Sequence, residues 1–537
     1  MSKKKSPFSF LCIGRSVVHS ALCAALASVV LVAVPNASAV LWNSASSTGN
    51  TYWGASGNWS GTIPNAIGDL AQIPTATSFR VITLADSAGV DASYTVGSFY
   101  FGSSGGGSNA YTYLLQNVAS GTGRLIFDVS SGNATLQFQD MFASSTQRIN
   151  TGITLNDNLS INPRSSLGIN QINGQISSGS GLTTGIIIAS NVVGGTVQLG
   201  ASNDYTGGTT INGGTLKLIT GNDRLPTATT LAVNGAASVA GVFDLNTFNQ
   251  KVGVLTGGSG TVNGSITNNA SGTGTATLTV ESTTTHSTFD GIIKNGSTAK
   301  VALTKAGAGT SLTLTGANTY TGATTVNGGS LIVNGSLASG SAVSIGASGT
   351  LGGSGTVSGT VAVAGTLSPG NSPGLLTTGA QTWSNGGNYN WQVMDATGSI
   401  GTGFDSIAIT TGGLNLTGLT TGGFNINLWS LSSIGPDVNG NAINFDNSIN
   451  HTWTLVSNTG DLTSVAGTLF NVNIVATNGT SGFSNNLGGG SFSVVGTSNS
   501  LDLVFTAASI PEPSTYAALV GSIALAGSVW CSRKRRA

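Results

Sequence analysis

The sequence predicts an all-β protein whose many short strands stack on one another as a solenoid. The first observation is composition: of 537 residues 80 are glycine and only 7% are charged. Such a chain disfavours long helices, because each interior glycine costs roughly 1 kcal/mol relative to alanine. Second, short runs of alternating apolar and small polar residues recur between Gly and Asn turns, which is typical of strands with one buried face. Third, the chain contains an internal repeat, and repeated units of a few short strands bury their apolar faces only by stacking.

The repeat is clearest over residues 197–218 and 312–335. Its Asn-Gly-Gly step at 327–329 predicts a turn, because these residues accept positive φ at little cost. Ten residues of the first copy recur in the second at one fixed offset. They are Asn203, Tyr205, Thr206, Gly207, Thr209, Thr210, Asn212, Gly213, Gly214 and Leu216, and their counterparts are Asn318, Tyr320, Thr321, Gly322, Thr324, Thr325, Asn327, Gly328, Gly329 and Leu331.

This pattern resembles the autotransporter-associated β-strand repeat, which reads G-x-N-T-Y-T-G-x-T-x-V-x-x-G-x-L. Residues 317–322 (ANTYTG) fit it closely, and the earlier copy differs by Asp204 in place of Thr. The resemblance implies a right-handed parallel β-helix in a secreted surface protein. The residue pattern alone also allows a β-sandwich, because both architectures use short strands with Gly-rich turns.

Residues 1–39 are expected to be a secretory signal peptide that directs the chain to the Sec translocon. Lys3–Lys5 and Arg15 form a basic region, 21–34 an apolar region, and Ala37 and Ala39 flank an A-x-A cleavage site. The apolar region is too short for an ordinary membrane-spanning helix.

Residues 40–110 are expected to form a Trp-rich N-terminal β cap. Trp42, Trp53 and Trp59 could cover the open strand edges at the end of a solenoid. The alternative is a carbohydrate platform, because flat indole faces can stack on sugar rings.

Residues 111–379 are expected to form the β-solenoid itself, and 380–508 a C-terminal β domain. The solenoid should end at residues 367–374 (LSPGNSPG), because proline lacks the N–H that a ladder needs. The strands expected after it are longer and more aromatic, as in a compact cap or a small sandwich.

The last segment, residues 509–537, resembles the PEP-CTERM sorting signal of Gram-negative bacteria that make exopolysaccharide. It consists of a motif of Pro511, Glu512 and Pro513, an apolar stretch over 516–530, and a basic cluster of Arg533, Lys534, Arg535 and Arg536. An apolar segment followed by basic residues is a stop-transfer arrangement, so we expect a short C-terminal transmembrane helix with a cytoplasmic tail.

The resemblance implies processing by an exosortase, which would recognise the Pro-Glu-Pro region. The chain would be held transiently in the inner membrane and then reach the cell surface, the outer membrane or the extracellular matrix. An ordinary tail anchor is the alternative, although the stretch is short for a permanent one.

Charge and cysteine content exclude several classes of function. Residues 40–510 hold ten basic and seventeen acidic residues, and 306–532 hold no Lys or Arg. Such a body has no phosphate-binding footprint, which argues against nucleic acid as a partner. The cysteines are Cys12, Cys23 and Cys531, so the body offers no disulfide, thiol or zinc chemistry.

No catalytic or metal-binding constellation is evident, and we expect neither a metal nor a cofactor. His286 and His451 lack the spacing of metal ligands. Asp437–Asn441 places oxygen ligands at alternate positions, as calcium prefers. Its glycine falls too early for an EF-hand and position twelve is Ser448, so an Asn/Gly turn is the better interpretation.

We therefore expect an exported protein that is not an enzyme and that contacts exopolysaccharide or cell-surface glycans through weak, multivalent rows of Thr, Ser and Asn. One alternative is a β-helical polysaccharide lyase or hydrolase. Such enzymes need paired carboxylates and charge stabilisation, whereas the acids here are isolated. The other is an autotransporter passenger-like adhesin, which we disfavour because no run of amphipathic ten-residue strands follows Phe505.

Overall fold

The computed structural model describes residues 39–43, 51–74, 80–101, 112–118, 121–139, 145–164, 166–236, 238–258, 262–433, 437–477, 480–509, 522–526 and 530. Every described residue belongs to one compact unit, residues 39–537. The predicted leader lies outside the described residues except for Ala39. The sorting motif at 511–513 and the basic cluster at 533–536 also lie outside them.

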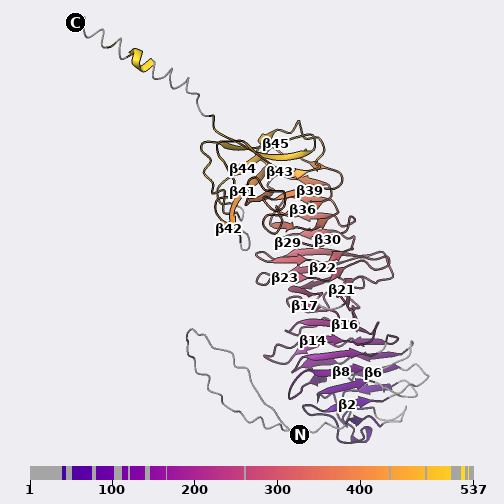
Figure 1. Ribbon diagram of the computed structural model, residues 1–537. Coiled ribbons are helices and arrows are strands. Elements are labelled where there is room, and N and C mark those ends of the chain that lie inside the picture. Colours follow the sequence, from indigo (N-terminus) through magenta and orange to yellow (C-terminus); the bar gives the residue numbers. More distant parts are fainter. Residues whose placement is uncertain are drawn as a thin grey trace, which may run out of the picture. The chain divides into compact units, whose positions relative to one another are not determined.

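Within the described residues the strands lie in three sets of parallel ladders, in which each strand pairs with the strand one turn further along the chain (Figure 1). The first ladder runs without a break through β1 (Val40–Leu41), β2 (Leu70–Ile73), β5 (Ser98–Phe101), β8 (Ala134–Phe138), β11 (Leu159–Pro163), β14 (Ile186–Ala189), β16 (Thr209–Leu218), β17 (Thr230–Val233), β20 (Val254–Gly257), β23 (Ser287–Phe289), β26 (Ser311–Leu314), β29 (Gly329–Val333), β32 (Gly349–Gly353), β35 (Thr366–Pro369), β38 (Asn388–Val393), β41 (Phe424–Ser433) and β44 (Phe470–Asn473).

The other two sets each consist of two successive ladders. The second set contains β3 (Arg80–Thr83), β6 (Thr112–Gln116), β9 (Thr146–Ile149), β12 (Ile169–Ile172), β15 (Thr196–Leu199), the second half of β16, β18 (Gly241–Asp244), β21 (Ser265–Thr267) and β24 (Ile292–Ile293), and then β27 (Ala317–Asn318), β30 (Ser336–Leu337), β33 (Thr356–Val357), β36 (Leu375–Thr378), β39 (Ser406–Ile409) and β43 (His451–Ser457). The third contains β4 (Tyr94–Val96), β7 (Arg124–Phe127), β10 (Gly152–Leu155) and β13 (Ile176–Ser178), and then β19 (Gln250–Val252), β22 (Thr275–Glu281), β25 (Lys300–Ala306), β28 (Thr324–Val326), β31 (Val343–Ile345), β34 (Val361–Val363), β37 (Gln381–Trp383) and β40 (Leu414–Asn415).

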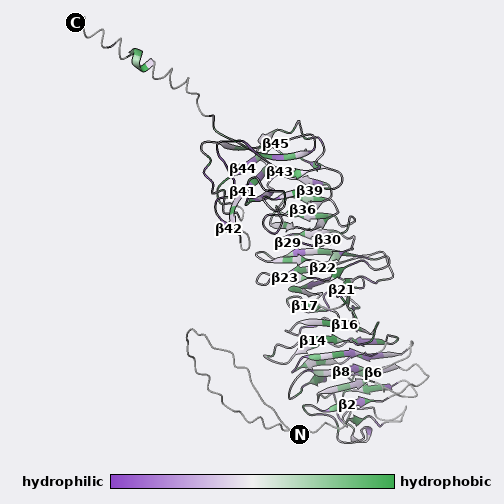
Figure 2. Ribbon diagram, in the orientation of Figure 1, coloured by the Kyte–Doolittle hydropathy of each residue, from purple (hydrophilic) through white to green (hydrophobic). Residues whose placement is uncertain are grey.

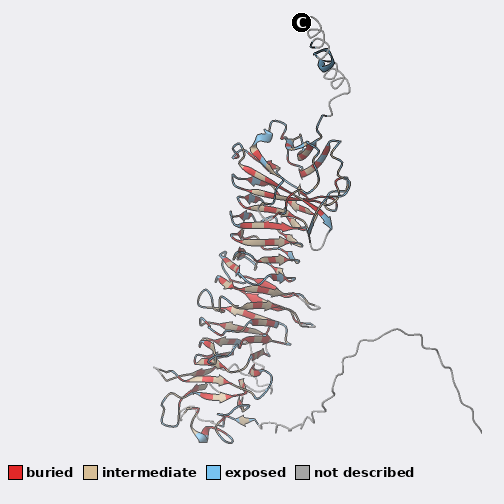
Figure 3. Cartoon of the chain, turned by 90° about the vertical axis from the view of Figure 1, so that its left-hand side faces the viewer, coloured by how far each residue is buried: buried red, intermediate tan, exposed pale blue. Residues whose placement is uncertain are grey.

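The core is a set of apolar columns that run from turn to turn. In the first ladder Leu312, Leu331, Leu351 and Leu367 pair in register, and all four are fully buried. Within β26 and β29 the residues next to these leucines are only partly buried and face outward. The alternation of apolar and polar residues in the sequence therefore matches the alternation of burial along each strand. Figure 2 shows the alternating hydropathy of the strands, and Figure 3 shows buried residues recurring on them throughout the stack. Parallel ladders of this kind confirm the stacked-strand prediction and exclude a β-sandwich.

The Asn-Gly-Gly step of the repeat is a corner of the backbone that requires glycine at its third position, and it lies within β16 in the first copy and at the junction of β28 and β29 in the second. Gly329 has φ of 65° and its counterpart Gly214 has φ of 79°, both in the left-handed region. A Cβ on Gly329 would lie 2.3 Å from the carbonyl oxygen of Thr310, in the turn below. The adjacent Gly328 has open space, because its nearest neighbour would lie 3.6 Å away.

Parallel pairing does not end at residues 367–374, contrary to the sequence expectation. β35 pairs with β38, β38 with β41, and β41 with β44, all in parallel. Pro369 is the last residue of β35, so its missing N–H falls where the strand itself stops.

Among the described residues, antiparallel pairing between whole strands appears only near the end of the body, whereas isolated antiparallel bridges such as Trp42–Trp59 occur elsewhere. β41 pairs with β42 (Val438–Asn439), and β46 (Ser500–Thr506) pairs with both β43 and β45 (Ser491–Gly496). The short 3-10 helices η1 (Ser56–Asn58) and η2 (Gly467–Leu469) complete the elements that the structure describes.

Of the predicted C-terminal transmembrane helix, only residues 522–526 and 530 are described, and they are helical. In the described part of the chain, no helix is both long and apolar enough to cross a membrane. The predicted spanning helix is therefore not found in the part of the chain that the structure describes.

The left-handed conformation of Gly329 predicts that Gly329→Ala lowers the free energy of unfolding by about 1–2 kcal/mol. This is the cost of placing a side chain in the left-handed region. Gly328→Ala is the matched control and should change it by less than about 0.5 kcal/mol. Chemical unfolding followed by circular dichroism measures both. Equal stability of the two variants would contradict the left-handed conformation of Gly329.

Candidate functional site

The three N-terminal tryptophans form a buried cluster and do not present a platform. Trp53 is fully buried and Trp42 and Trp59 are nearly so. The ring centroids of Trp42 and Trp59 lie 4.9 Å apart at 86°, and those of Trp53 and Trp59 lie 4.8 Å apart. The indole N–H of Trp53 donates to the Pro64 carbonyl and that of Trp59 to the Trp53 carbonyl. These rings pack on one another, so they cannot stack on a sugar, and the carbohydrate-platform interpretation is wrong.

The recurring tyrosines of the repeat are also buried. The hydroxyl groups of Tyr205 and Thr209 are 2.6 Å apart, and those of Tyr320 and Thr324 are 2.7 Å apart. Tyr320 is fully buried, and this burial raises the pKa of its phenol to about 12.

The recurring asparagine ties successive turns together through the backbone. The side-chain oxygen of Asn318 accepts from the Ile293 N–H at 2.9 Å, and its amide nitrogen donates to the Ser336 carbonyl at 3.2 Å. Asn203 repeats this arrangement between the Ile176 N–H and the Arg224 carbonyl. The recurring Asn and Tyr side chains of the repeat therefore hold the stack together.

The histidines have ordinary structural partners. His286 Nδ1 lies 2.8 Å from the Ser311 hydroxyl, and the His451 ring stacks on Trp453 with centroids 5.3 Å apart. Among the described residues no group of three His, Cys, Asp or Glu side chains could hold a metal ion.

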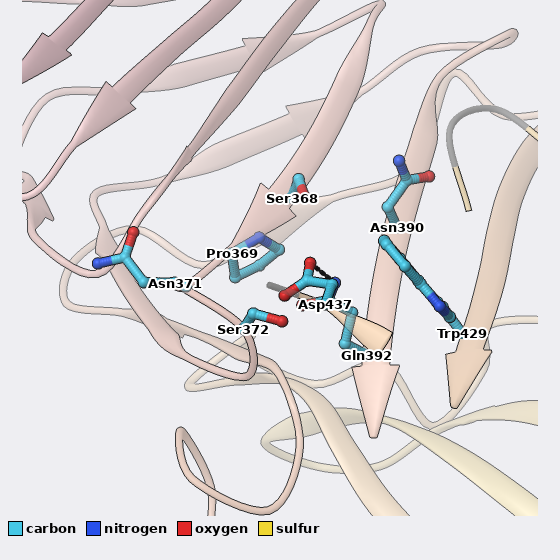
Figure 4. A pocket seen from close by; sticks show the side chains of 9 residues that line it. Ser368, Pro369, Asn371, Ser372, Asn390, Gln392, Trp429 and Asp437 are labelled. Atoms are coloured by element: carbon cyan, nitrogen blue, oxygen red, sulfur yellow. Dashed lines mark hydrogen bonds between the residues drawn. The ribbon is translucent and has the colours of Figure 1, made fainter. Parts of the chain in front are cut away.

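A pocket of about 300 Å³ opens on the outer face of the first ladder near its C-terminal end (Figure 4). The outward-facing side chains of β35, β38 and β41 form its floor, and the loop after β35 and the residue before β42 form its rim. The lining residues are Ser368, Pro369, Gly370, Asn371, Ser372, Asn390, Gln392, Trp429 and Asp437.

Register explains why these side chains meet. Gln392 on β38 pairs with Trp429 on β41, so both lie in one outward row. Asp437 approaches this row and accepts a hydrogen bond from Gln392 Nε2 at 2.9 Å. Figure 4 shows Asp437, Gln392 and Ser372 grouped together, with Asn371 and Trp429 on opposite sides of them.

Two polar atoms of the pocket are buried without a hydrogen-bond partner among the described residues. They are the Ser372 hydroxyl oxygen and the Trp429 indole nitrogen. A buried donor that lacks an acceptor costs free energy, and a bound ligand that supplies the acceptor would recover it. Ser372 also has φ of 75°, a conformation that non-glycine residues rarely adopt and that clusters at functional sites.

A buried carboxyl group holds the rim of the pocket in place. Asp405 is fully buried, and its two oxygens accept from the Gly374 N–H at 2.7 Å and the Gln392 N–H at 2.9 Å. Burial raises the pKa of Asp405 well above its ordinary value. Asp405 is not among the lining residues, so its role is to position the loop and β38.

A ladder of asparagine side chains supports the floor. Asn427 Nδ2 donates to the Asn390 side-chain oxygen at 2.9 Å, and Asn473 Nδ2 donates to that of Asn427 at 2.8 Å. Stacked amides of this kind fix the orientation of Asn390 at the pocket.

A second, more open hollow of about 460 Å³ lies over the second set of ladders. Arg148 lines it together with Asn150, Gln171 and Asn173, and the Arg148 guanidinium donates to the Gln171 side-chain oxygen at 2.7 Å. These polar side chains are also stacked from turn to turn, because β9 pairs with β12 in register.

Sequence reasoning noticed two parts of the pocket but assigned them other roles. Residues 367–374 were expected to end the solenoid, and Asp437 was considered for a calcium loop. The structure instead places Val438–Asn439 in β42, a hairpin strand against β41. No sequence pattern marks Trp429, Gln392 or Asn390 as part of a site, because only the register of β38 against β41 brings them together.

The predicted sorting and cleavage residues are not part of this site. Ala37, the motif at 511–513 and the basic cluster at 533–536 lie outside the described residues, and Ala39 is exposed at the start of the described chain.

Comparison with known protein families finds a match in two segments of the chain. Residues 194–218 and 303–333 match the passenger-associated transport repeat. The two matched segments contain the two copies of the internal repeat, including the buried Asn and Tyr residues described above. A search of curated proteins finds no match.

The contacts of Asn318 predict that Asn318→Ala lowers the free energy of unfolding by about 1–3 kcal/mol, because the Ile293 N–H loses its acceptor inside the core. Asn327→Ala, an exposed residue of the same repeat, is the control and should change it by less than about 0.5 kcal/mol. Denaturant titration of the two variants would refute the bridging role if their midpoints coincide.

The raised pKa of Asp405 predicts a specific pH dependence. The folded carboxyl group keeps its proton at pH values where the unfolded one, near 3.8, has lost it. Its contribution to stability is therefore fully present below about pH 3.8 and is lost as pH rises through the raised pKa.

Asp405→Asn has no such titration, so the melting temperature of the wild type minus that of the variant should fall as pH rises from about 3.5 to 8. Thermal melts of both proteins across this range measure the difference. A difference that stays constant or grows with pH would rule out a protonated Asp405.

Proposed function

We propose that this protein is an exported, non-enzymatic β-solenoid of the cell surface or extracellular matrix of a Gram-negative bacterium, associated with exopolysaccharide or with adhesion. The observation that supports this most is the match of both repeat copies to the passenger-associated transport repeat. The coil is right-handed in this proposal, as crossovers between parallel strands nearly always are.

Its mechanism is mechanical and interfacial. Buried columns and inter-turn hydrogen bonds stabilise the stack. Outward rows of polar side chains repeat from turn to turn, as in the column of Thr256, Thr288 and Thr313. Regularly spaced weak contacts of this kind bind a polymer tightly in sum, because each contact after the first is effectively intramolecular. The partner is an exopolysaccharide or another cell-surface glycan, and nucleic acid is not a partner.

Export begins at the Sec translocon and ends with exosortase processing. The leader is removed after Ala39, and the apolar segment before the basic cluster at 533–536 holds the chain in the inner membrane for a time. The exosortase recognises Pro511, Glu512 and Pro513 and releases the body toward the surface. The support for this step is the similarity of residues 511–536 to the PEP-CTERM signal.

The absence of catalysis is part of the proposal. Hydrolysis or elimination at a glycosidic bond requires two acid–base groups flanking the bond. Among the lining residues of the pocket that the structure describes, Asp437 is the one carboxylate, and the buried Asp405 lies behind the wall. A polysaccharide lyase or hydrolase is therefore disfavoured.

A second candidate is an autotransporter passenger-like adhesin, which the matched repeats favour directly. The two candidates differ in how the C-terminus is processed. A passenger depends on its own translocating segment, whereas the proposed protein depends on the Pro-Glu-Pro motif.

We predict that the mature protein from fractionated native cells begins at Val40 and lacks the basic cluster at 533–536. The triple variant Pro511→Ala, Glu512→Ala, Pro513→Ala should retain its tail and accumulate in the inner membrane. Mass spectrometry of the two termini, combined with blotting of the fractions, measures this. Ser514→Ala, next to the motif, is the control and should be processed normally.

Tail removal that continues in the triple variant would refute exosortase sorting and favour the passenger candidate. Release of sugars from a panel of neutral and acidic polysaccharides by the purified chain would refute the non-enzymatic assignment.

A further inference from the structure

We propose that the pocket over β35, β38 and β41 is a binding site for an uncharged saccharide segment of a glycan. This inference deepens the proposed function, since it adds the class of glycan and the place of contact. It rests on the proposed function only for the presence of glycan around the protein.

Aromatic, amide and carboxylate groups meet in the pocket. Trp429 is partly exposed and lies in the outward row with Gln392, next to the carboxylate of Asp437. A sugar ring has an apolar C–H face and a rim of hydroxyl groups. An indole face packs against the former, and carboxylate and amide groups bind the latter. The volume of about 300 Å³ is that of a small ligand pocket.

The pocket also has unused hydrogen-bonding capacity. The Trp429 indole N–H and the Ser372 hydroxyl are buried and lack partners in the described part of the chain. Hydroxyl groups of a sugar both donate and accept, so they can pair with an indole donor, a serine hydroxyl and a carboxylate alike. An apolar ligand would leave these groups unpaired, at a cost in affinity.

The charge of the lining residues selects between neutral and acidic glycans. Asp437 is the one charged side chain among the described lining residues, and no Lys or Arg lines the pocket. An acidic polysaccharide would bring carboxylate or sulfate groups near Asp437 without a compensating cation, and like charges repel. The pocket therefore favours neutral sugars over uronic acids.

The loop and the floor of the pocket are preorganised. The buried Asp405 carboxyl group binds the backbone of Gly374 and Gln392, and the asparagine ladder fixes Asn390. The loop and the floor are thus held in place before a ligand arrives, which lowers the entropy cost of binding.

The test is isothermal titration of the full-length chain with neutral gluco-, manno- and galacto-oligosaccharides and with oligogalacturonate. We expect at least one neutral oligosaccharide to bind and oligogalacturonate not to bind. Trp429→Ala should weaken binding at least about tenfold, as loss of a buried aromatic contact usually does. Asp437→Asn should weaken it about threefold or more while leaving the fold unchanged.

Tyr100→Ala is the matched control, because Tyr100 is a partly exposed aromatic residue on the first ladder at β5, many turns from the pocket. It should bind like the wild type, and circular dichroism should show the same fold in all variants. If Trp429→Ala does not fold, the Asp437→Asn result decides the question.

Three results would overturn the proposal. They are the absence of binding to every neutral oligosaccharide, binding that neither variant weakens, and a Ca²⁺ titration whose heat Asp437→Asn abolishes while sugars give none. Each of these leaves the processing of the termini unaffected, so failure of this proposal is distinguishable from failure of the proposed export and sorting.

Discussion

In-register parallel pairing of short strands is the constraint on which the structure depends. Leu312, Leu331, Leu351 and Leu367 meet only if each turn is placed without a slip, since a shift of one residue would move every apolar side chain to the outer face. The turns must therefore stack closely and reproducibly. The glycine at 329 lets the backbone turn where a Cβ would strike the turn below, and Asn318 bonds the turns on either side of its own.

The same register that buries one row of side chains also builds the outer surface. Outward residues stack as columns, and the asparagine ladder through Asn427 shows that such a column can be a continuous chain of hydrogen bonds. The pocket occurs where an outward row that includes Trp429 is overhung by the loop after β35 and by Asp437. The same strand register thus produces both the stable stack and the pocket. The inward-facing side chains stabilise the stack, and the outward-facing side chains line the pocket.

The strand class, the stacking and the importance of the repeat could be predicted from the sequence, because they depend on local alternation and on the Asn, Tyr and Gly residues that recur. The end of the parallel ladder could not, because Pro369 breaks a ladder only if it lies inside a strand, and strand ends are not visible in the pattern. The burial of Trp53 was also not determined by composition, since a tryptophan suits a core and a sugar platform equally well. The pocket could not be predicted because the turn lengths between β35, β38 and β41 are irregular, and these lengths decide which outward residues meet.

The most direct test of the account is a set of spin-label distances along the first ladder, in a chain whose native cysteines are replaced by serine. Ser160 and Thr313 lie in one outward column, with Ile187, Thr210, Ala232, Thr256 and Thr288 between them. With a strand spacing of about 4.8 Å, the Cα distance from Ser160 should be about 19 Å to Thr256 and about 29 Å to Thr313. Distances that increase in these steps are the predicted result. Distances that fail to increase with the number of turns would contradict the parallel stack.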